Sequence, residues 1–256
     1  MVSCHVHPFA SGTKRLTVSC RRRNPTETSK FSVGCGGAMK AAYVDITSTT
    51  GKKYQRAPTG ALTSDVNAQS FFPSGHIVLN GTKRGGLWGW DLRSRRRIFE
   101  WDRATNASEP TGSILDIHVL RDGRRAVLER SNGELRLVDL RRTLCPVVEF
   151  VPGVPKRYLP HLRCAIDTNE SVVVAGGDVQ HPRTIQSFDL RHGRLVASID
   201  VQSAHGVETP SSTLVQQVQF MSGPDGSYYD DMPGIWAIAR NELFVCTGRR
   251  PDRVKE

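Results

Sequence analysis

The chain has 256 residues, a formal net charge of +10 at pH 7 and 38% hydrophobic residues. This length can bury a core that needs no disulfide or structural metal, and no apolar run approaches the length of a membrane span. The N-terminus lacks the pattern of a signal peptide, and the six cysteines show no pair spacing, which indicates reduced thiols in the nucleus or cytoplasm. The composition therefore excludes membrane-embedded proteins and secreted disulfide scaffolds.

The positive charge comes mainly from arginine, which is gathered in short clusters. A basic balance favours acidic partners, either nucleic acid or an acidic protein surface, although the same clusters also suit a solvated surface. Few aromatic residues alternate with the charges, so the stacking half of a nucleic-acid site is missing. The clusters are Arg21–Arg23, Arg93–Arg97, Arg124–Arg125, Arg141–Arg142 and Arg249–Arg250.

Short strands separated by turn residues are predicted from the start of the chain. The first unit, residues 1–57, begins with a strand at Val2–His7. The polar and basic stretch 10–30 is interpreted as a surface loop inserted into this unit. The further strands of the unit are Phe31–Cys35, Met39–Ile46 and Tyr54–Arg56.

The second and third units, residues 62–102 and 113–151, each contain four predicted strands. Pro73-Ser74-Gly75 and Asp122-Gly123 are turn signals, and Asn132-Gly133 is a strong two-residue hairpin signal. The strands are Ser64–Phe72, His76–Leu79, Gly85–Asp91 and Arg96–Trp101, then Ile114–Leu120, Arg125–Glu129, Leu135–Leu140 and Pro146–Val151.

The fourth and fifth units, residues 158–201 and 212–248, continue the pattern, and residues 249–256 form a charged tail. No apolar pattern with a helical period of useful length occurs anywhere in the chain. The predicted strands are Leu162–Ile166, Ser171–Ala175, Thr184–Leu190 and Leu195–Ile199, then Leu214–Met221, Ile235–Ala239 and Glu242–Cys246.

One tetrapeptide recurs at the end of a strand in successive units. Its aspartates, Asp45, Asp91, Asp139 and Asp189, are 46, 48 and 50 residues apart, which is the period of four-stranded blades. The sequence therefore predicts an all-β protein, a β-propeller with about five recognisable blades. The copies are Val44-Asp45-Ile46-Thr47, Trp90-Asp91-Leu92-Arg93, Val138-Asp139-Leu140-Arg141 and Phe188-Asp189-Leu190-Arg191.

The copy at Trp90–Arg93 resembles the close of a WD40 repeat. Two adjacent repeats that each end in Asp-Leu-Arg resemble the substrate receptors of cullin-4 ubiquitin ligases, and the order of further segments is similar to one receptor family, WD repeat protein 21, also called cullin-4-associated factor 4. Those segments are Ser3-Cys4 with Pro8, Phe31–Gly34, Tyr158–Pro160, Ser171–Asp178, Leu190–Leu195 and Pro233–Ile238. The resemblance covers most of Val2–Gly248 except the stretch 10–30.

The resemblance implies a non-catalytic scaffold that binds the large β-propeller adaptor of the ligase and presents a target protein for ubiquitination. The adaptor-contacting residues of the family fall here on Asp91, Arg93, Asp139 and Arg141, and the weaker candidates are Trp90, Asp189 and Arg191. Propellers of this family have about seven blades, so the chain is expected either to hold part of such a propeller, without its N-terminal blades, or to close its ring in an atypical way.

The Asp-Leu-Arg positions also make physical sense as a docking surface. Arginine presents a rigid fork of five N–H donors that suits carboxylates and backbone oxygens. The aspartate two residues earlier can orient that fork or accept an N–H at the strand end. Alternatively, the two side chains simply form a surface salt bridge worth less than about 1 kcal/mol.

The sequence also departs from strong WD40 repeats. The usual Gly-His near each blade start is absent, and Arg84 and Asn132 stand near the position of the usual hairpin aspartate. We therefore expect the buried His–Asp network of WD40 blades to be missing, with packing holding the blades together.

The sequence shows no convincing catalytic, phosphate-binding or metal-binding motif. No phosphate-binding P-loop occurs, Cys4 with His5 and His7 lacks a second ligand pair, and Cys164 near His161 lacks an orienting motif. We expect no cofactor, metal, small-molecule substrate or membrane partner. A general WD40 scaffold in RNA-processing or chromatin complexes is the main alternative, and a propeller enzyme ranks far behind.

Overall fold

The computed structural model describes residues 18–35, 41–45, 53–56, 64–101, 112–142, 145–150, 163–176, 184–200, 215–220, 235–239 and 242–246. Strands linked by turns make up these ranges. Within them there is no helix long and apolar enough to cross a membrane.

Within the described ranges, nineteen strands form five antiparallel sheets, in each of which the order of strands in space follows their order in the chain. The first four sheets have four strands each and the fifth has three. The strands are β1 (Val18–Arg23), β2 (Lys30–Cys35), β3 (Ala41–Asp45), β4 (Lys53–Arg56), β5 (Val66–Phe71), β6 (Ile77–Thr82), β7 (Leu87–Asp91), β8 (Arg96–Trp101), β9 (Ile114–Val119), β10 (Arg125–Arg130), β11 (Leu135–Asp139), β12 (Cys145–Phe150), β13 (Ala165–Ile166), β14 (Val172–Gly176), β15 (Thr184–Asp189), β16 (Leu195–Asp200), β17 (Val215–Phe220), β18 (Ile235–Ala239) and β19 (Glu242–Cys246).

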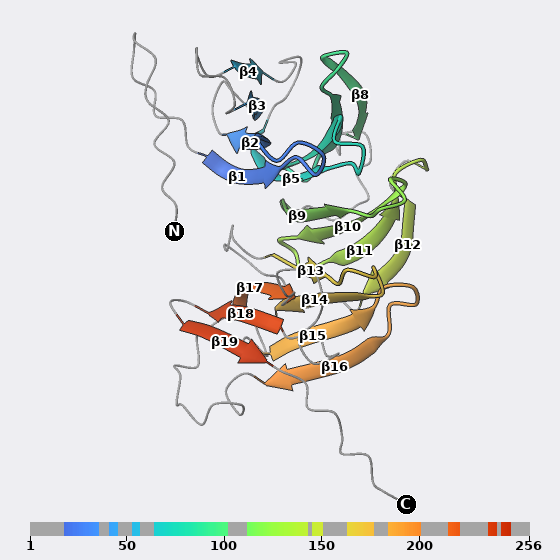
Figure 1. Cartoon of the computed structure of the whole chain (residues 1–256). Coiled ribbons are helices and arrows are strands. Elements are labelled where there is room, and N and C mark those ends of the chain that lie inside the picture. The colour runs from blue at the N-terminus through green and yellow to red at the C-terminus, as the bar shows by residue number, and fades with distance from the viewer. Residues whose placement is uncertain are drawn as a thin grey trace, which may run out of the picture.

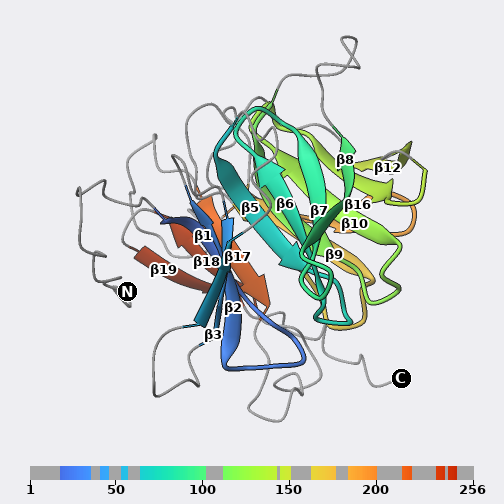
Figure 2. The ribbon, with the colours of Figure 1, turned by 90° about the horizontal axis from the view of Figure 1, so that it is seen from above.

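The sheets follow one another along an arc, with the first strand of each sheet on the concave side (Figure 1). In the view from above, the first and fifth sheets lie towards the left and the other three sheets towards the right (Figure 2). On the concave side, β5 contacts β1 and β9, and β13 contacts β17. This radial arrangement of four-stranded sheets is that of β-propeller blades, so the predicted fold class is confirmed.

Tight turns inside the blades follow the sequence signals. Gly123 and Gly133 adopt φ angles of 63° and 90°, a left-handed conformation that glycine reaches without the steric cost of a Cβ. Each turn is closed by a backbone hydrogen bond, from Gly123 N to Leu120 O at 2.9 Å and from Gly133 N to Arg130 O at 3.0 Å. The predicted Asp-Gly and Asn-Gly turns are therefore present.

The hydrophobic core is divided into clusters that lie between consecutive sheets. Side chains alternate between the two faces of a strand, so one strand serves two clusters. In β10, Ala126 and Leu128 pack with Leu79 of the second sheet, whereas Val127 packs with Val173 of the fourth sheet. Burial of such side chains, worth about 1.5–3 kcal/mol each, therefore joins the blades to one another.

The prediction of a surface loop over residues 10–30 is wrong for the second half of that stretch. There, Val18–Arg23 forms β1, the innermost strand of the first sheet. The polar sequence of this segment is satisfied by distant partners. Arg22 Nε donates to the carbonyl oxygen of Gln69 at 2.9 Å, and the guanidinium forms an ion pair with Asp116. Asn24, which is 1% exposed, donates to the carbonyl oxygen of Gly75 at 2.9 Å. The strand predicted at Val2–His7 lies outside the described residues.

The strands predicted for the second to fifth units coincide with β5–β19 within a few residues, apart from β13, which is shorter than expected. The limits of the units and the tail 249–256 fall mostly on residues that are not described, so the domain boundaries stay predictions.

We predict that Gly81→Ala destabilises the protein by about 1–3 kcal/mol, because overpacking of a dense core forces side chains off their preferred rotamers. A Cβ at Gly81, on β6, would lie 2.5 Å from Ile114 Cγ2 of the next sheet. Urea unfolding followed by circular dichroism measures the change.

Gly86→Ala is the matched control, because a Cβ there would meet Thr82 Oγ1 at 3.3 Å and nothing closer. Its stability is expected to change by less than about 1 kcal/mol. Equal effects of the two substitutions would contradict the tight fit between the second and third sheets.

Candidate functional site

Three Asp-Leu-Arg segments occupy equivalent places at the ends of β7, β11 and β15. In each, the leucine N–H donates to the carbonyl oxygen just before the second strand of the same sheet, at 2.8 Å. The pairs are Leu92 with His76, Leu140 with Arg124, and Leu190 with Ser171. The three turns therefore lie at the same edge of the second, third and fourth sheets, here called the Asp-Leu-Arg edge.

The aspartates brace these turns. The backbone N–H two residues later donates to the Oδ1 atom of Asp91 at 2.8 Å, of Asp139 at 2.9 Å and of Asp189 at 2.7 Å. A short side chain that accepts this bond stabilises a tight turn in the manner of an Asx-turn. One of the two roles weighed from the sequence, acceptance of a strand-end N–H, is therefore present in all three blades.

The arginines differ in how far their guanidinium groups are engaged. Arg141 is held by Asp139 through two bonds, Nε to Oδ1 at 3.0 Å and Nη2 to Oδ2 at 2.7 Å. Arg93 Nε lies 3.5 Å from Asp91 Oδ1, a weak contact. The side chains of Arg93 and Arg141 are 66% and 57% exposed, so both guanidinium groups can reach a partner.

The third copy has a different ion pair. Asp189 Oδ2 lies 2.8 Å from His192 Nδ1. Arg191 is exposed, and its backbone N–H donates to Asp189 Oδ1. Arg191 and Asp189 are therefore brought to the same edge, but they do not reproduce the pairing of Asp139 with Arg141.

Trp90, a weaker candidate from the sequence, is fully buried. It belongs to the cluster with Ala41 of the first sheet and Val66 of the second. Both faces of β7 are buried, and alternation turns Trp90 towards the first sheet while the residues after the strand reach the edge, so the side chain of Trp90 is not accessible to a partner in this structure.

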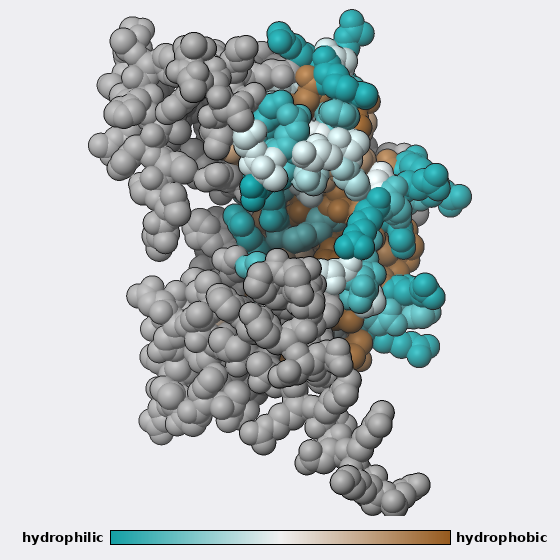
Figure 3. Space-filling model, in the orientation of Figure 1, coloured by the Kyte–Doolittle hydropathy of each residue, from teal (hydrophilic) through white to brown (hydrophobic). Residues whose placement is uncertain are grey.

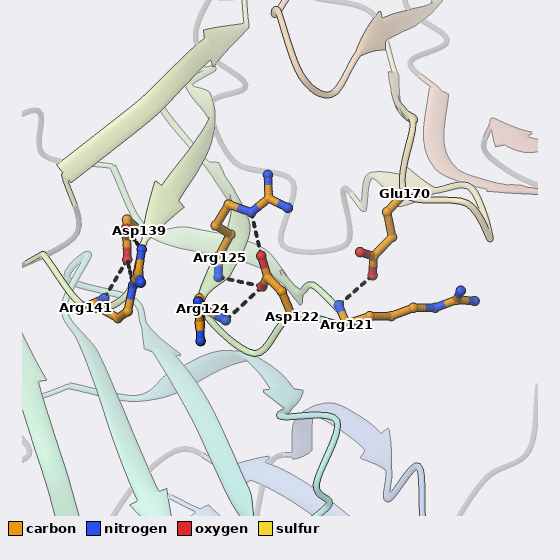
Figure 4. Close-up of polar contacts among 7 residues, drawn as sticks. All are labelled: Arg121, Asp122, Arg124, Arg125, Asp139, Arg141 and Glu170. Carbon is orange, nitrogen blue, oxygen red and sulfur yellow. Dashed lines mark hydrogen bonds and ion pairs between the residues drawn. The ribbon is translucent and has the colours of Figure 1, made fainter.

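A second turn adds charge to the same edge (Figure 4). Asp122 Oδ1 accepts the N–H groups of Arg124 and Arg125 at 2.8 and 3.0 Å. Arg121 N donates to Glu170 Oε1 of the fourth sheet at 2.6 Å, which links the edges of neighbouring blades. These residues were not assigned to the candidate site from the sequence. The available signal was topological, because the first and third turns of an antiparallel four-stranded blade lie at the same end of it.

The edge is strongly basic. Its described carboxylates are largely engaged in bracing turns, while arginines project outward. Figure 3 shows hydrophilic side chains projecting in groups along one side of the molecule, over the second to fourth sheets. A cleft or edge of one sign attracts partners of the opposite sign, so an acidic surface suits this edge. The exposed arginines are Arg93, Arg95, Arg121, Arg124, Arg141, Arg142, Arg191 and Arg194.

Asp139 titrates well below its ordinary range. The side-chain hydrogen bonds from Arg141, followed by its backbone N–H, lower the pKa of Asp139 from 3.8 to about 2. Burial raises the pKa of Asp91, but the hydrogen bonds from Arg93 outweigh it and lower the pKa overall. At Asp189, the side-chain hydrogen bond from His192, followed by the backbone N–H of Arg191, lowers the pKa.

One group of metal-ligating side chains occurs among the described residues, and it lies on the inner strands, away from these turns. It consists of Asp116, His118 and Cys164. The pair of His118 with Asp116, at 3.0 Å, lies within the single strand β9 and is not the His–Asp network of WD40 blades, so the expected absence of that network stays a prediction. His161, weighed as a partner of Cys164, lies outside the described residues.

No protein-family model matches the chain. DDB1- and CUL4-associated factor 4-like protein 2 of Homo sapiens is 28% identical over 182 residues, which cover 71% of this chain and 42% of that protein. DDB1- and CUL4-associated factor 4 of Bos taurus is 24% identical over 181 residues, which cover 71% of this chain and 34% of that protein. The chain thus spans less than half the length of these relatives, and the expected resemblance is confirmed.

Solved structures support the fold alone. The Cps50 (Swd1) β-propeller domain of Myceliophteria thermophila matches with a TM-score of 0.63 and 15% identity, covering 91% of this chain and 70% of that one. The computationally designed Ika8 protein matches with a TM-score of 0.57 and 13% identity, covering 86% and 56%.

We predict that the Asp139 carboxyl titrates with a midpoint of about 2 by NMR. Since its pKa is lower in the folded state, the stabilisation it gives is present above pH 3.8 and is lost as the pH falls through about 2. Arg141→Ala is expected to move the midpoint upward. Arg142→Ala, the control, removes only the weakest of the interactions that lower this pKa, and an equal shift in both variants would contradict the pairing with Arg141.

Proposed function

We propose that this chain is a non-catalytic WD40 substrate receptor that docks on DDB1 in a cullin-4 ubiquitin ligase and presents a target protein for ubiquitination. The relatives are named for association with DDB1 and CUL4, and we propose the same association for this chain. The observation that supports docking is the repetition of an exposed, turn-braced arginine at equivalent places of adjacent blades.

The geometry of the Asp-Leu-Arg edge suits capture of an acidic or carbonyl-rich surface. In the second blade, Arg93 is mostly exposed and only weakly held by Asp91. In the third blade, Asp139 uses two of the five guanidinium N–H donors of Arg141. The remaining donors can bind a partner while the aspartate keeps the side chain in place, which reduces the entropy lost on docking.

The roles of the named residues follow from this geometry. Asp91 and Asp139 position the turns, and Arg93 and Arg141 make the contacts with the adaptor. Arg191 extends the surface into the fourth blade without an aspartate to orient its side chain. The target protein is expected to bind elsewhere on the propeller, and the cysteine pattern supports the proposal that this role is carried out in the nucleus or cytoplasm.

A general scaffold that binds nucleic acid is the second candidate, because the same edge carries many exposed arginines. Binding of that kind depends on the total charge and falls steeply with salt. It therefore predicts that every charge-reversed patch weakens RNA binding, wherever on the blade the patch lies.

The double variant Arg93→Glu with Arg141→Glu is expected to weaken binding to purified DDB1 about 30-fold or more, which corresponds to the loss of about 2 kcal/mol from close charge pairs. Binding is measured by surface plasmon resonance on the immobilised adaptor. Circular dichroism establishes that each variant is folded.

Lys83→Glu with Arg84→Glu is the matched control. These two residues are exposed at the opposite end of the second blade, and the substitution changes the net charge by the same amount. Undiminished DDB1 binding by a folded Arg93 and Arg141 variant would overturn the docking edge, and salt-sensitive RNA binding that both variants weaken equally would support the alternative scaffold.

A further inference from the structure

Three side chains of the kinds that bind transition metals meet between the third and fourth sheets. Asp116 and His118 are two residues apart on β9, so their side chains point to the same side of the strand, and Cys164 comes just before β13. Their ligand atoms all lie within 4.8 Å of one another. We propose that Asp116, His118 and Cys164 form a Zn²⁺ site that joins the third and fourth blades.

The donor set fits zinc. Zn²⁺ takes carboxylate oxygen, imidazole nitrogen and thiolate sulfur, at about 2.0–2.2 Å for oxygen and nitrogen and about 2.3 Å for sulfur. Tetrahedral geometry then places oxygen and nitrogen about 3.3 Å apart. His118 Nε2 lies 3.0 Å from Asp116 Oδ2 and also 3.0 Å from the carbonyl oxygen of Cys164. The ion therefore requires the imidazole to give up its hydrogen bond to that carbonyl and to move a few tenths of an ångström from Asp116, while the three ligand atoms, which lie within 4.8 Å of one another, close around it.

Asp116 is already oriented for such a role. Its Oδ1 accepts the backbone N–H of Ile117 at 3.0 Å and pairs with Arg22, while Oδ2 faces His118. Partners that fix a ligating carboxylate through its other oxygen are common around metal sites.

Ion binding changes the protons and the net charge of the site. Without metal, Arg22 pairs with Asp116. Binding of Zn²⁺ requires Cys164 to give up its thiol proton to solvent as the zinc–sulfur bond forms, and His118 to bind through an unprotonated Nε2 while the proton resides on Nδ1. The thiolate offsets one of the two positive charges that the ion adds, so the site gains a net charge of +1 next to the Asp116 carboxylate.

Burial allows the ion to enter and then excludes most water. Asp116 and Cys164 are each 3% exposed, while the side chain of His118 is 26% exposed and offers a route from solvent. Three protein ligands leave a fourth position for water, as in open zinc sites. The contacts that carry this proposal are independent of the Asp-Leu-Arg edge.

Co²⁺ titration of the metal-free full chain tests the site, because a thiolate ligand gives Co²⁺ an intense near-ultraviolet charge-transfer band. We expect one Co²⁺ per chain, displaced by Zn²⁺, with that band present. Cys164→Ser is expected to remove the band, and His118→Asn to weaken Co²⁺ binding about 100-fold or more, since even substitutions around the ligands cost 10–100-fold. Cys145→Ser is the control, because Cys145 begins the outermost strand of its sheet, and it should leave the spectrum unchanged.

Zinc-edge X-ray absorption on the unsubstituted chain gives a readout that does not depend on whether a variant folds. A sulfur neighbour at about 2.3 Å is expected. Absence of stoichiometric Co²⁺ and Zn²⁺ binding, a zinc shell without sulfur, or a charge-transfer band that survives in folded Cys164→Ser would each overturn the proposal and leave Asp116 and His118 as an ion-pair network.

Discussion

The burial of both faces of every inner sheet is the constraint on which the rest of this structure depends. A four-stranded sheet that is apolar on both sides is insoluble alone, so it must pack between two neighbours. The clusters between consecutive sheets meet this need, because they contain the buried apolar side chains of both sheet faces. What remains available for function is the set of turns at the strand ends and the inner strands on the concave side.

The strand-end turns show how closely core and surface are joined in this fold. Trp90 is fully buried against the first sheet, while Arg93, three residues later, has a side chain that is 66% exposed. The aspartate between them turns the chain and holds it at the edge. Because packing fixes the strand and the strand fixes the turn, equivalent arginines are presented at regular positions along the arc, which a flexible surface loop could not achieve.

Much of the fold could be predicted from the sequence because its signals are local. Alternating strands, Asp-Gly and Asn-Gly turns and the repeated Asp-Leu-Arg segment each depend on neighbouring residues. β1 was missed because its central arginine has non-local partners: Arg22 pairs with Asp116, 94 positions away. The candidate site divides in the same way. Repetition placed Asp91, Arg93, Asp139 and Arg141 at one edge, but the pairing of Asp189 with His192 depends on the shape of a single turn. The candidate Trp90 is buried because both faces of β7 pack against neighbouring sheets.

The two polar regions left by this packing are suited to different ligands. At the edge, Asp139 is bound to an arginine that remains 57% exposed, so solvent screens each pair and useful affinity requires several contacts spread over adjacent blades, as a protein surface provides. On the inner strands, Asp116 is buried, and the charges of Arg22 and His118 act on it with little screening. A buried carboxylate flanked by an imidazole and a thiol is too small and too enclosed for a macromolecule, but it has the size and chemistry of a site for one metal ion. A single constraint, the stacking of two-faced sheets, thus leaves an extended outer edge that suits the proposed protein partner and a confined inner cluster that suits the proposed ion.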